Sequence, residues 1–170
     1  MDKIIKNIHV RNFESRDAEV CFKIRRAAFI QKFQPELGAR ATAAGVDAFM
    51  PDDYVQMAQT GPFFVAEDDG GGVIGFVTLE RKGSGVAEIP LIYIDLDQIG
   101  KQIGQTMMGY IEQWVTTNWS DVTTLIVNTV IPEYNGGFYR KVGFIPAGDA
   151  ICRFGNMPVR ALRLEKKLGS

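Results

Sequence analysis

Three apolar segments joined by two short glycine-rich turns constrain the fold of this chain most. The segments are residues 63–67, 73–81 and 87–94, and the turns between them are residues 68–72 and 82–85. Aspartate and glycine in such turns supply the left-handed backbone geometry that tight hairpins need. We therefore expect an antiparallel meander. The third segment is almost entirely apolar after its second residue, which predicts a central strand buried on both faces.

The segment before the meander is predicted to be helical. The first helix is expected over residues 16–33, with Pro35 ending it. Its predicted buried face consists of Val20, Cys21, Ile24, Ala27, Ala28 and Phe29, and its predicted solvent face carries Arg25, Arg26 and Lys32. A second helix over residues 36–50, interrupted at Gly45, is expected next. Pro51 suits the first position of a third helix.

The segment after the meander alternates between helical and strand-like patterns. Helices are predicted over residues 101–118 and 132–141, and strands over residues 122–127, from residue 144 onward and over residues 161–168, in addition to a first strand over residues 4–13. Strand–helix–strand units favour parallel neighbours with right-handed crossovers. The prediction is an α/β (α+β) fold with a single mixed, mostly antiparallel central sheet and helices on both faces. Because no internal repeat or linker interrupts the pattern, we expect one domain over residues 1–170.

The composition excludes several classes of function. Nineteen Lys and Arg against twenty Asp and Glu give a net charge of -1, so binding of nucleic acid by bulk electrostatics is not expected. A single histidine and two cysteines remove most zinc sites and most His-dependent catalysis, and no metal site is predicted. No signal peptide and no apolar run long enough to cross a membrane is found, so a cytoplasmic protein with reduced Cys21 and Cys152 is expected.

The loop over residues 95–104 is the first candidate for a binding site. It follows a buried strand and leads into a helix, whose free N–H groups and positive dipole end attract anions. Gly100 and Gly104 would let a diphosphate approach the backbone, and Lys101 adds charge. The loop fits neither the Walker pattern nor the dinucleotide fingerprint GxGxxG. An ordinary strand-to-helix turn is the alternative interpretation. Asp95 and Asp97 are expected to be turn formers and not metal ligands.

The second candidate is the segment over residues 132–144, PEYNGGFYRKVGF. Tyr139 could present its hydroxyl as an acid, and Arg140 and Lys141 could contact phosphates. The alternative is a short amphipathic helix that places Phe138 and Tyr139 in the core.

Taken together, these segments resemble the GNAT superfamily of N-acetyltransferases. The resemblance runs from the helix with IRRAAF (residues 24–29) to the last strand, and it is most specific at VIGFV (73–77), EIPLIYID (88–95) with its glycine loop, and FYRKVGF (138–144). It implies acetyl-CoA as cosubstrate. The implied diphosphate cradle is Ile99, Gly100, Lys101, Gln102, Ile103 and Gly104, and the strand residues pairing with pantetheine are Ile92 and Ile94. Ile99 stands where the family favours Gln or Arg, Gln102 where it favours Gly, and Pro132 where it favours Asn.

The resemblance implies a reaction in which an acetyl group passes directly from acetyl-CoA to a primary amine of a small molecule or a protein. Tyr139 is the implied acid for the leaving thiolate, and Glu88 is the implied base, with Glu80 as its rival. The acceptor amine is not identified, although residues 33–54 and the turns near Gly83 and Ala147 are expected to contact it. A homodimer is possible because dimers are common in the family. A catalytically weak acyl-CoA-binding module and a purely structural partner-binding protein are the alternatives.

Overall fold

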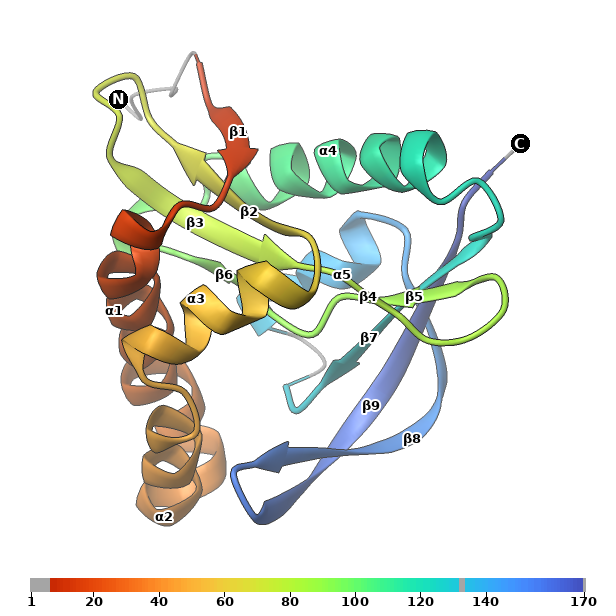
Figure 1. Cartoon of the computed structure of the whole chain (residues 1–170). Coiled ribbons are helices and arrows are strands. Elements are labelled where there is room, and N and C mark those ends of the chain that lie inside the picture. Colours follow the sequence, from red (N-terminus) through yellow and green to blue (C-terminus); the bar gives the residue numbers. More distant parts are fainter. Residues whose placement is uncertain (1–6, 132–133, 170) are drawn as a thin grey trace.

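The computed structural model describes residues 7–131 and 134–169 (Figure 1). Its strands are β1 (His9–Asn12), β2 (Phe63–Glu67), β3 (Val73–Thr78), β4 (Glu80–Arg81), β5 (Val86–Glu88), β6 (Ile92–Ile94), β7 (Thr124–Thr129), β8 (Ile145–Phe154) and β9 (Met157–Lys167). Its helices are α1 (Ala18–Ala28), α2 (Gln34–Asp47), α3 (Pro51–Thr60), α4 (Ile103–Asn118) and α5 (Tyr134–Lys141), with short helical turns at Ser15–Asp17, Phe29–Phe33 and Leu96–Gln98. The predicted starts of the first strand and of the helix at Pro132 lie outside the described residues.

The meander and the mixed α/β architecture are confirmed. β2 pairs antiparallel with β3, β3 with β6 and β4 with β5, whereas β5 runs parallel to β7. The hydrogen-bonded strands form two groups, in the orders β1-β2-β3-β6 and β4-β5-β7-β9-β8. The two groups are consecutive parts of one layer, because β3 continues into β4 and β5 leads into β6 (Figure 1).

The predicted strand over residues 87–94 is wrong in one respect, because it is divided into β5 and β6. Pro90 lies at the division and has no backbone N–H to offer a neighbouring strand. Just before it, the N–H of Ile89 still donates to Ile126 of β7 over 2.9 Å. Just after it, the carbonyl of Leu91 accepts from the N–H of Thr78, also over 2.9 Å. The chain thus changes partner at Pro90, and β6 separates from β7.

The N-terminal helices depart from the prediction at two residues. Pro35 does not end the first helix, because it lies in the first turn of α2, where a missing N–H costs nothing. Gly45 does not interrupt the second helix either. It is buried within α2, and the non-helical residue is Gly38, with φ of 85°.

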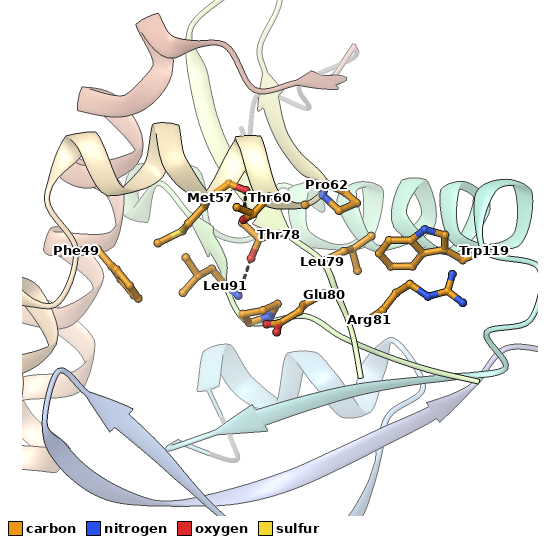
Figure 2. Close-up of a pocket in the computed structure, with 12 residues that line it drawn as sticks. Phe49, Met57, Thr60, Pro62, Thr78, Leu79, Glu80, Arg81, Leu91 and Trp119 are labelled. Atoms are coloured by element: carbon orange, nitrogen blue, oxygen red, sulfur yellow. Dashed lines mark hydrogen bonds between the residues drawn. The ribbon is translucent and has the colours of Figure 1, made fainter. Parts of the chain in front are cut away.

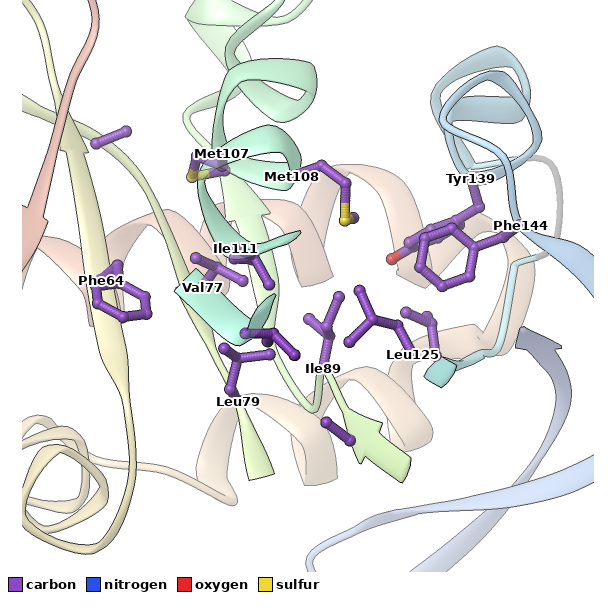
Figure 3. Packing of buried hydrophobic residues seen from close by; sticks show 14 of the residues in the cluster. Phe64, Val77, Leu79, Ile89, Met107, Met108, Ile111, Leu125, Tyr139 and Phe144 are labelled. Carbon is purple, nitrogen blue, oxygen red and sulfur yellow. The ribbon is translucent and has the colours of Figure 1, made fainter. Parts of the chain in front are cut away.

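The helices cover both faces of the sheet, as predicted. On one face, α4 and α5 bury a core that includes Met107, Met108, Ile111 and Tyr139 (Figure 3). On the other face, α1 and α3 pack on β2 and β3 through residues such as Cys21 and Tyr54. A third cluster joins α2 to β8 around Phe29. Within residues 7–131 and 134–169, no helix is long and apolar enough to cross a membrane.

Candidate functional site

A cavity of about 300 Å³ lies where β6 separates from β7, and we call it the splay cavity. Its walls come from β5 and β6, β7, β8, α5 and the N-terminal helices. The lining residues are Arg25, Phe33, Phe49, Glu88, Ile89, Pro90, Leu91, Ile92, Tyr93, Val127, Asn128, Thr129, Val130, Tyr139, Ile151, Cys152, Arg153 and Phe154.

The splay cavity reaches both faces of the sheet. Ile92 and Tyr139 belong to the core beneath α4 and α5. Tyr93 and Phe33 belong to the clusters beneath the N-terminal helices. Because alternate residues of a strand point to opposite faces, β6 itself lines the cavity with Ile92 on one side and Tyr93 on the other. One molecule could therefore approach from each face.

Glu88 lies in the splay cavity at the end of β5, with 15% of its side chain exposed. Its carboxylate accepts a hydrogen bond from Nδ2 of Asn128 over 3.3 Å and lies 3.4 Å from Nζ of Lys82. These contacts fix the carboxylate at the cavity wall. Oδ1 of Asn128 is buried without a hydrogen-bond partner, so the Glu88–Asn128 pair retains a free acceptor.

Glu80, the rival base, lies in a different hollow. This hollow has a volume of about 580 Å³ and lies between α3 and β4 (Figure 2). It shares Phe49, Pro90 and Leu91 with the splay cavity, so the two adjoin on either side of the β5–β6 connection. Glu80 is paired to Lys82 over 3.1 Å and is well exposed. The geometry therefore brings Glu88, and not Glu80, into one cavity with Tyr139.

Tyr139 is both a core residue and a cavity residue. It is 8% exposed, and its ring contacts those of Phe138 and Phe144, with centroids 5.3 and 6.0 Å away (Figure 3). It also lines the splay cavity opposite the N-terminal helices. The two interpretations left open by the sequence are thus compatible, because the ring fills the core while the residue borders the cavity.

A second cavity of about 250 Å³ lies at the loop before α4, and we call it the loop cavity. It is lined by Ile94, Gln98, Ile99, Gly100, Gln102, Ile103, Gly104, Gln105, Phe138 and Lys141. β6 and α5 contribute residues to both cavities. Ile92 and Tyr139 line the splay cavity, and Ile94 and Phe138 line the loop cavity. The two cavities therefore follow one another along β6 and α5.

The loop leaves the start of α4 open to an anion. The side chain of Asp95 accepts from the N–H of Asp97 over 3.0 Å, which confirms it as a turn former. α4 begins at Ile103, two residues later than predicted, and no side chain caps its N-terminus. Uncapped N–H groups at the start of a long helix are the usual receptors for phosphate. The backbone here fits the diphosphate that the resemblance implies.

The charged residues predicted for this loop are placed differently. Lys101 donates to Oε1 of Gln98 over 3.1 Å and is not among the residues that line the loop cavity. Arg140 is exposed on α5 and lines neither cavity. Lys141, one residue further along α5, does line the loop cavity. The cation among the residues that line the loop cavity thus comes from α5 and not from the loop.

Gly104 has a packing role that the sequence did not reveal. A Cβ atom at this position would lie 2.7 Å from the ring of Phe138 and 3.0 Å from Cδ1 of Ile94. Only glycine lets α5 approach the first turn of α4 this closely, and this approach gives the loop cavity one of its walls.

Gln102 adopts the left-handed conformation, with φ of 64°, alone among the non-glycine residues described. Its side chain is exposed, and its carbonyl accepts from the N–H of Thr106 over 3.0 Å. A side chain in this conformation costs roughly 1–2 kcal/mol, so the family's preference for glycine here has a physical basis. Gln102→Gly is therefore expected to raise the free energy of unfolding by roughly 1 kcal/mol in urea denaturation. Gln105→Gly, in the first turn of α4, is the control and is expected to lower the free energy of unfolding. A lower free energy of unfolding in both variants would show that the conformation of Gln102 is not strained.

Arg25 is 4% exposed, so the prediction that it lies on the solvent face of its helix is wrong. Cys21 and Phe29, four residues to either side, are fully buried, and residues at this spacing share one helical face. The spacing would have located Arg25 on the buried face, but its charge suggested the opposite. Arg25 lines the splay cavity.

The environment of the cavity keeps two of its titratable groups protonated. Burial raises the pKa of the Cys152 thiol, and the charge of Glu88 raises it further. Burial also raises the pKa of Tyr93, against the opposing effect of Arg25. A protonated thiol is a poor nucleophile. Cys152 is thus unsuited to carry an acyl group. Among the described residues, no group of His, Cys, Asp and Glu side chains could hold a metal ion.

The chain was compared with known proteins. Residues 59–146, a little more than half of the chain, match the family model of the acetyltransferase (GNAT) domain. No curated protein matches the sequence.

Solved structures of acetyltransferases share the fold. PaiA N-acetyltransferase from Thermoplasma acidophilum, in complex with coenzyme A, is 17% identical with a TM-score of 0.77, over 95% of this chain and 99% of that one. A GCN5-related N-acetyltransferase from Rhodopseudomonas palustris is 17% identical with a TM-score of 0.78, over 98% and 99%. YncA from Salmonella typhimurium, with its cofactor acetyl-CoA, is 13% identical with a TM-score of 0.69, over 97% and 96%.

The family model covers the meander, the glycine loop, α4, β7 and α5, which line the loop cavity and part of the splay cavity. The chain therefore belongs to the GNAT family of N-acetyltransferases.

Proposed function

We propose that the protein transfers the acetyl group of acetyl-CoA directly to a primary amine. The observation that carries this proposal is the splay cavity, which is lined by both Glu88 and Tyr139 and is followed along β6 and α5 by the loop cavity. The fold of the family and the coenzyme A and acetyl-CoA in the similar structures support the choice of cosubstrate. Acetyl-CoA would supply the acetyl group as a thioester.

The loop and α5 are proposed to hold the cosubstrate. Backbone N–H groups of Ile103 and Gly104, at the uncapped start of α4, would bind the diphosphate. Lys141 would add a positive charge at the same place. Ile92 and Ile94 of β6 would border the pantetheine arm, because β6 has no partner strand on the side of β7.

Glu88 and Tyr139 are proposed to move the protons. An ammonium ion must lose a proton before its nitrogen can attack a carbonyl, and Glu88 would accept that proton directly or through water. A new C–N bond then forms and the C–S bond breaks. Tyr139 would give its hydroxyl proton to the departing thiolate. The nitrogen sheds its second proton as the amide forms, and that proton would restore the Tyr139 hydroxyl directly or through water. The protonated Cys152 favours direct transfer over an acylated cysteine.

Binding of acetyl-CoA tests this proposal first. At about 100 times its dissociation constant, a ligand stabilises the folded state by about 2.7 kcal/mol. For a protein of this size that corresponds to a rise in melting temperature of roughly 5–10 °C. Differential scanning fluorimetry should show this rise with acetyl-CoA and a much smaller one with NAD⁺, which lacks the pantetheine arm. No shift at millimolar acetyl-CoA would refute the proposal.

A further inference from the structure

Arg25 is a buried cation without an acidic partner among the described residues. No ion pair formed by the described residues involves it. Its Nη1 donates to the carbonyl of Gly45 over 2.6 Å, and its Nε is buried without a hydrogen-bond partner. Burying a charge is costly unless it is paired. The site thus maintains a guanidinium whose hydrogen-bonding capacity is only partly used.

Aromatic rings hold the guanidinium in place. Its central carbon lies 4.3 Å from the ring centroid of Phe29, 4.8 Å from that of Phe49 and 5.9 Å from that of Tyr93. Rings attract a cation over their faces, whereas the N–H donors of a guanidinium lie along its edge. The hydroxyl of Tyr54, whose ring packs against Phe49, is buried beside Arg25, and its interaction with Arg25 opposes the rise in the pKa of Tyr54 that burial causes.

Arg25 lies on the side of the splay cavity from which the acceptor must approach. It lines the splay cavity from the N-terminal helices, whereas Tyr139 lines it from α5 on the other face. The cosubstrate is proposed to follow β6 and α5, so the amine must come from the side of Arg25. Arg153 also lines the cavity, and the one carboxylate there, Glu88, already has Lys82 and Asn128 as partners.

We propose that Arg25 binds a carboxylate of the acceptor, which makes the acceptor a small amine of the amino-acid class. This inference rests on the function proposed above. A planar carboxylate matches the edge of a guanidinium, and on that edge Nε of Arg25 has no hydrogen-bond partner. Because Arg25 is almost fully buried, the carboxylate must enter the cavity together with the amine. A cavity of about 300 Å³ admits an amino acid but no folded protein surface.

Paired acceptors test the inference. Each of several amino acids is compared with the amine left by its decarboxylation, for example phenylalanine with phenethylamine, and kcat/KM is measured by release of the coenzyme A thiol. A hydrogen-bonded ion pair predicts that the wild-type enzyme prefers the carboxylate-bearing member of the best pair roughly 10- to 100-fold. Arg25→Met, which keeps the side-chain stem, should lower kcat/KM for the amino acid much more than for the matching amine, so that the preference is lost. Arg25→Lys should retain part of it.

The control is Arg26→Met, because Arg26 is the exposed neighbour on the same helix and lines neither cavity. It should keep the full preference. Equal or better use of the decarboxylated amines by the wild-type enzyme would overturn the inference and leave the acetyltransferase activity intact. This wild-type comparison also decides the matter if Arg25→Met does not fold. No thiol release with any amine would overturn the proposed function, and the inference with it.

Discussion

Gly45→Ala is expected to destabilise the fold by about 3 kcal/mol, the upper end of the usual cost of overpacking a core. A Cβ atom on Gly45 would lie 2.1 Å from Cε1 of Phe29. The Phe29 ring cannot retreat, because it is fully buried against Phe33 and Phe154, with centroids 4.5 and 5.0 Å away. The same glycine provides the carbonyl that holds Arg25. The substitution should therefore disturb both the packing of α2 and the acceptor side of the splay cavity.

Urea denaturation of Gly45→Ala beside Gly109→Ala isolates this effect. Gly109 is exposed within α4, and a Cβ there would meet nothing within 4 Å. Alanine is favoured over glycine in a helix by up to about 1 kcal/mol, so Gly109→Ala should be stabilised by about that amount. The two helical substitutions are expected to shift stability in opposite directions. Equal stability of the two variants would show that Phe29 can move and that Gly45 is not required for packing.

Tyr139→Phe is expected to lower kcat by a factor of about 10² or more while the protein remains folded, since general acid catalysis contributes about 10²–10⁴. The ring that packs against Phe138 and Phe144 is kept. Loss of a hydroxyl group should change the free energy of unfolding by only about 1 kcal/mol. Affinity for acetyl-CoA should be unchanged, because the hydroxyl acts only on the departing sulfur. The measurement is steady-state thiol release, with melting temperature as the check on folding.

Tyr110→Phe is the matched control for this substitution. Tyr110 lies on α4, 36% exposed, with its ring against Phe64 at 5.1 Å, and it lines neither cavity. It should keep full kcat. If Tyr139→Phe is as active as Tyr110→Phe, Tyr139 is a core residue only and another group protonates the thiolate.

The order of the elements was predictable because it depends on local patterns. The glycine turns predicted the meander, and the apolar stripe of α4 predicted a helix packed on the sheet. The division at Pro90 was not predicted, because an apolar run does not show where a strand changes partner. Pro90 was the available signal, since a proline is rarely found inside a central strand. The split that creates the splay cavity was therefore missed.

The candidate site was predictable in part. Glu88, Tyr139, Ile92 and Ile94 came from the resemblance, and the structure places all of them along the two cavities. Arg25 was assigned to the solvent face because charged residues are rarely buried. Its burial depends on three aromatic rings, one each from the turn after α1, the connection between α2 and α3, and β6, which only the tertiary structure brings together. Close approaches such as that of Phe138 to Gly104 are likewise invisible in the sequence.

The proposed activity is tested most directly by following the acetyl group itself. The purified protein is incubated with acetyl-CoA and a panel of amino acids, simple amines and peptides, and products are analysed by mass spectrometry beside a reaction without protein. At least one amino acid is expected to gain an acetyl group on its amine, with one coenzyme A thiol released per acetylated molecule. Binding of acetyl-CoA with no acetylated amine above the protein-free reaction would contradict the proposed activity and indicate an acyl-CoA-binding module.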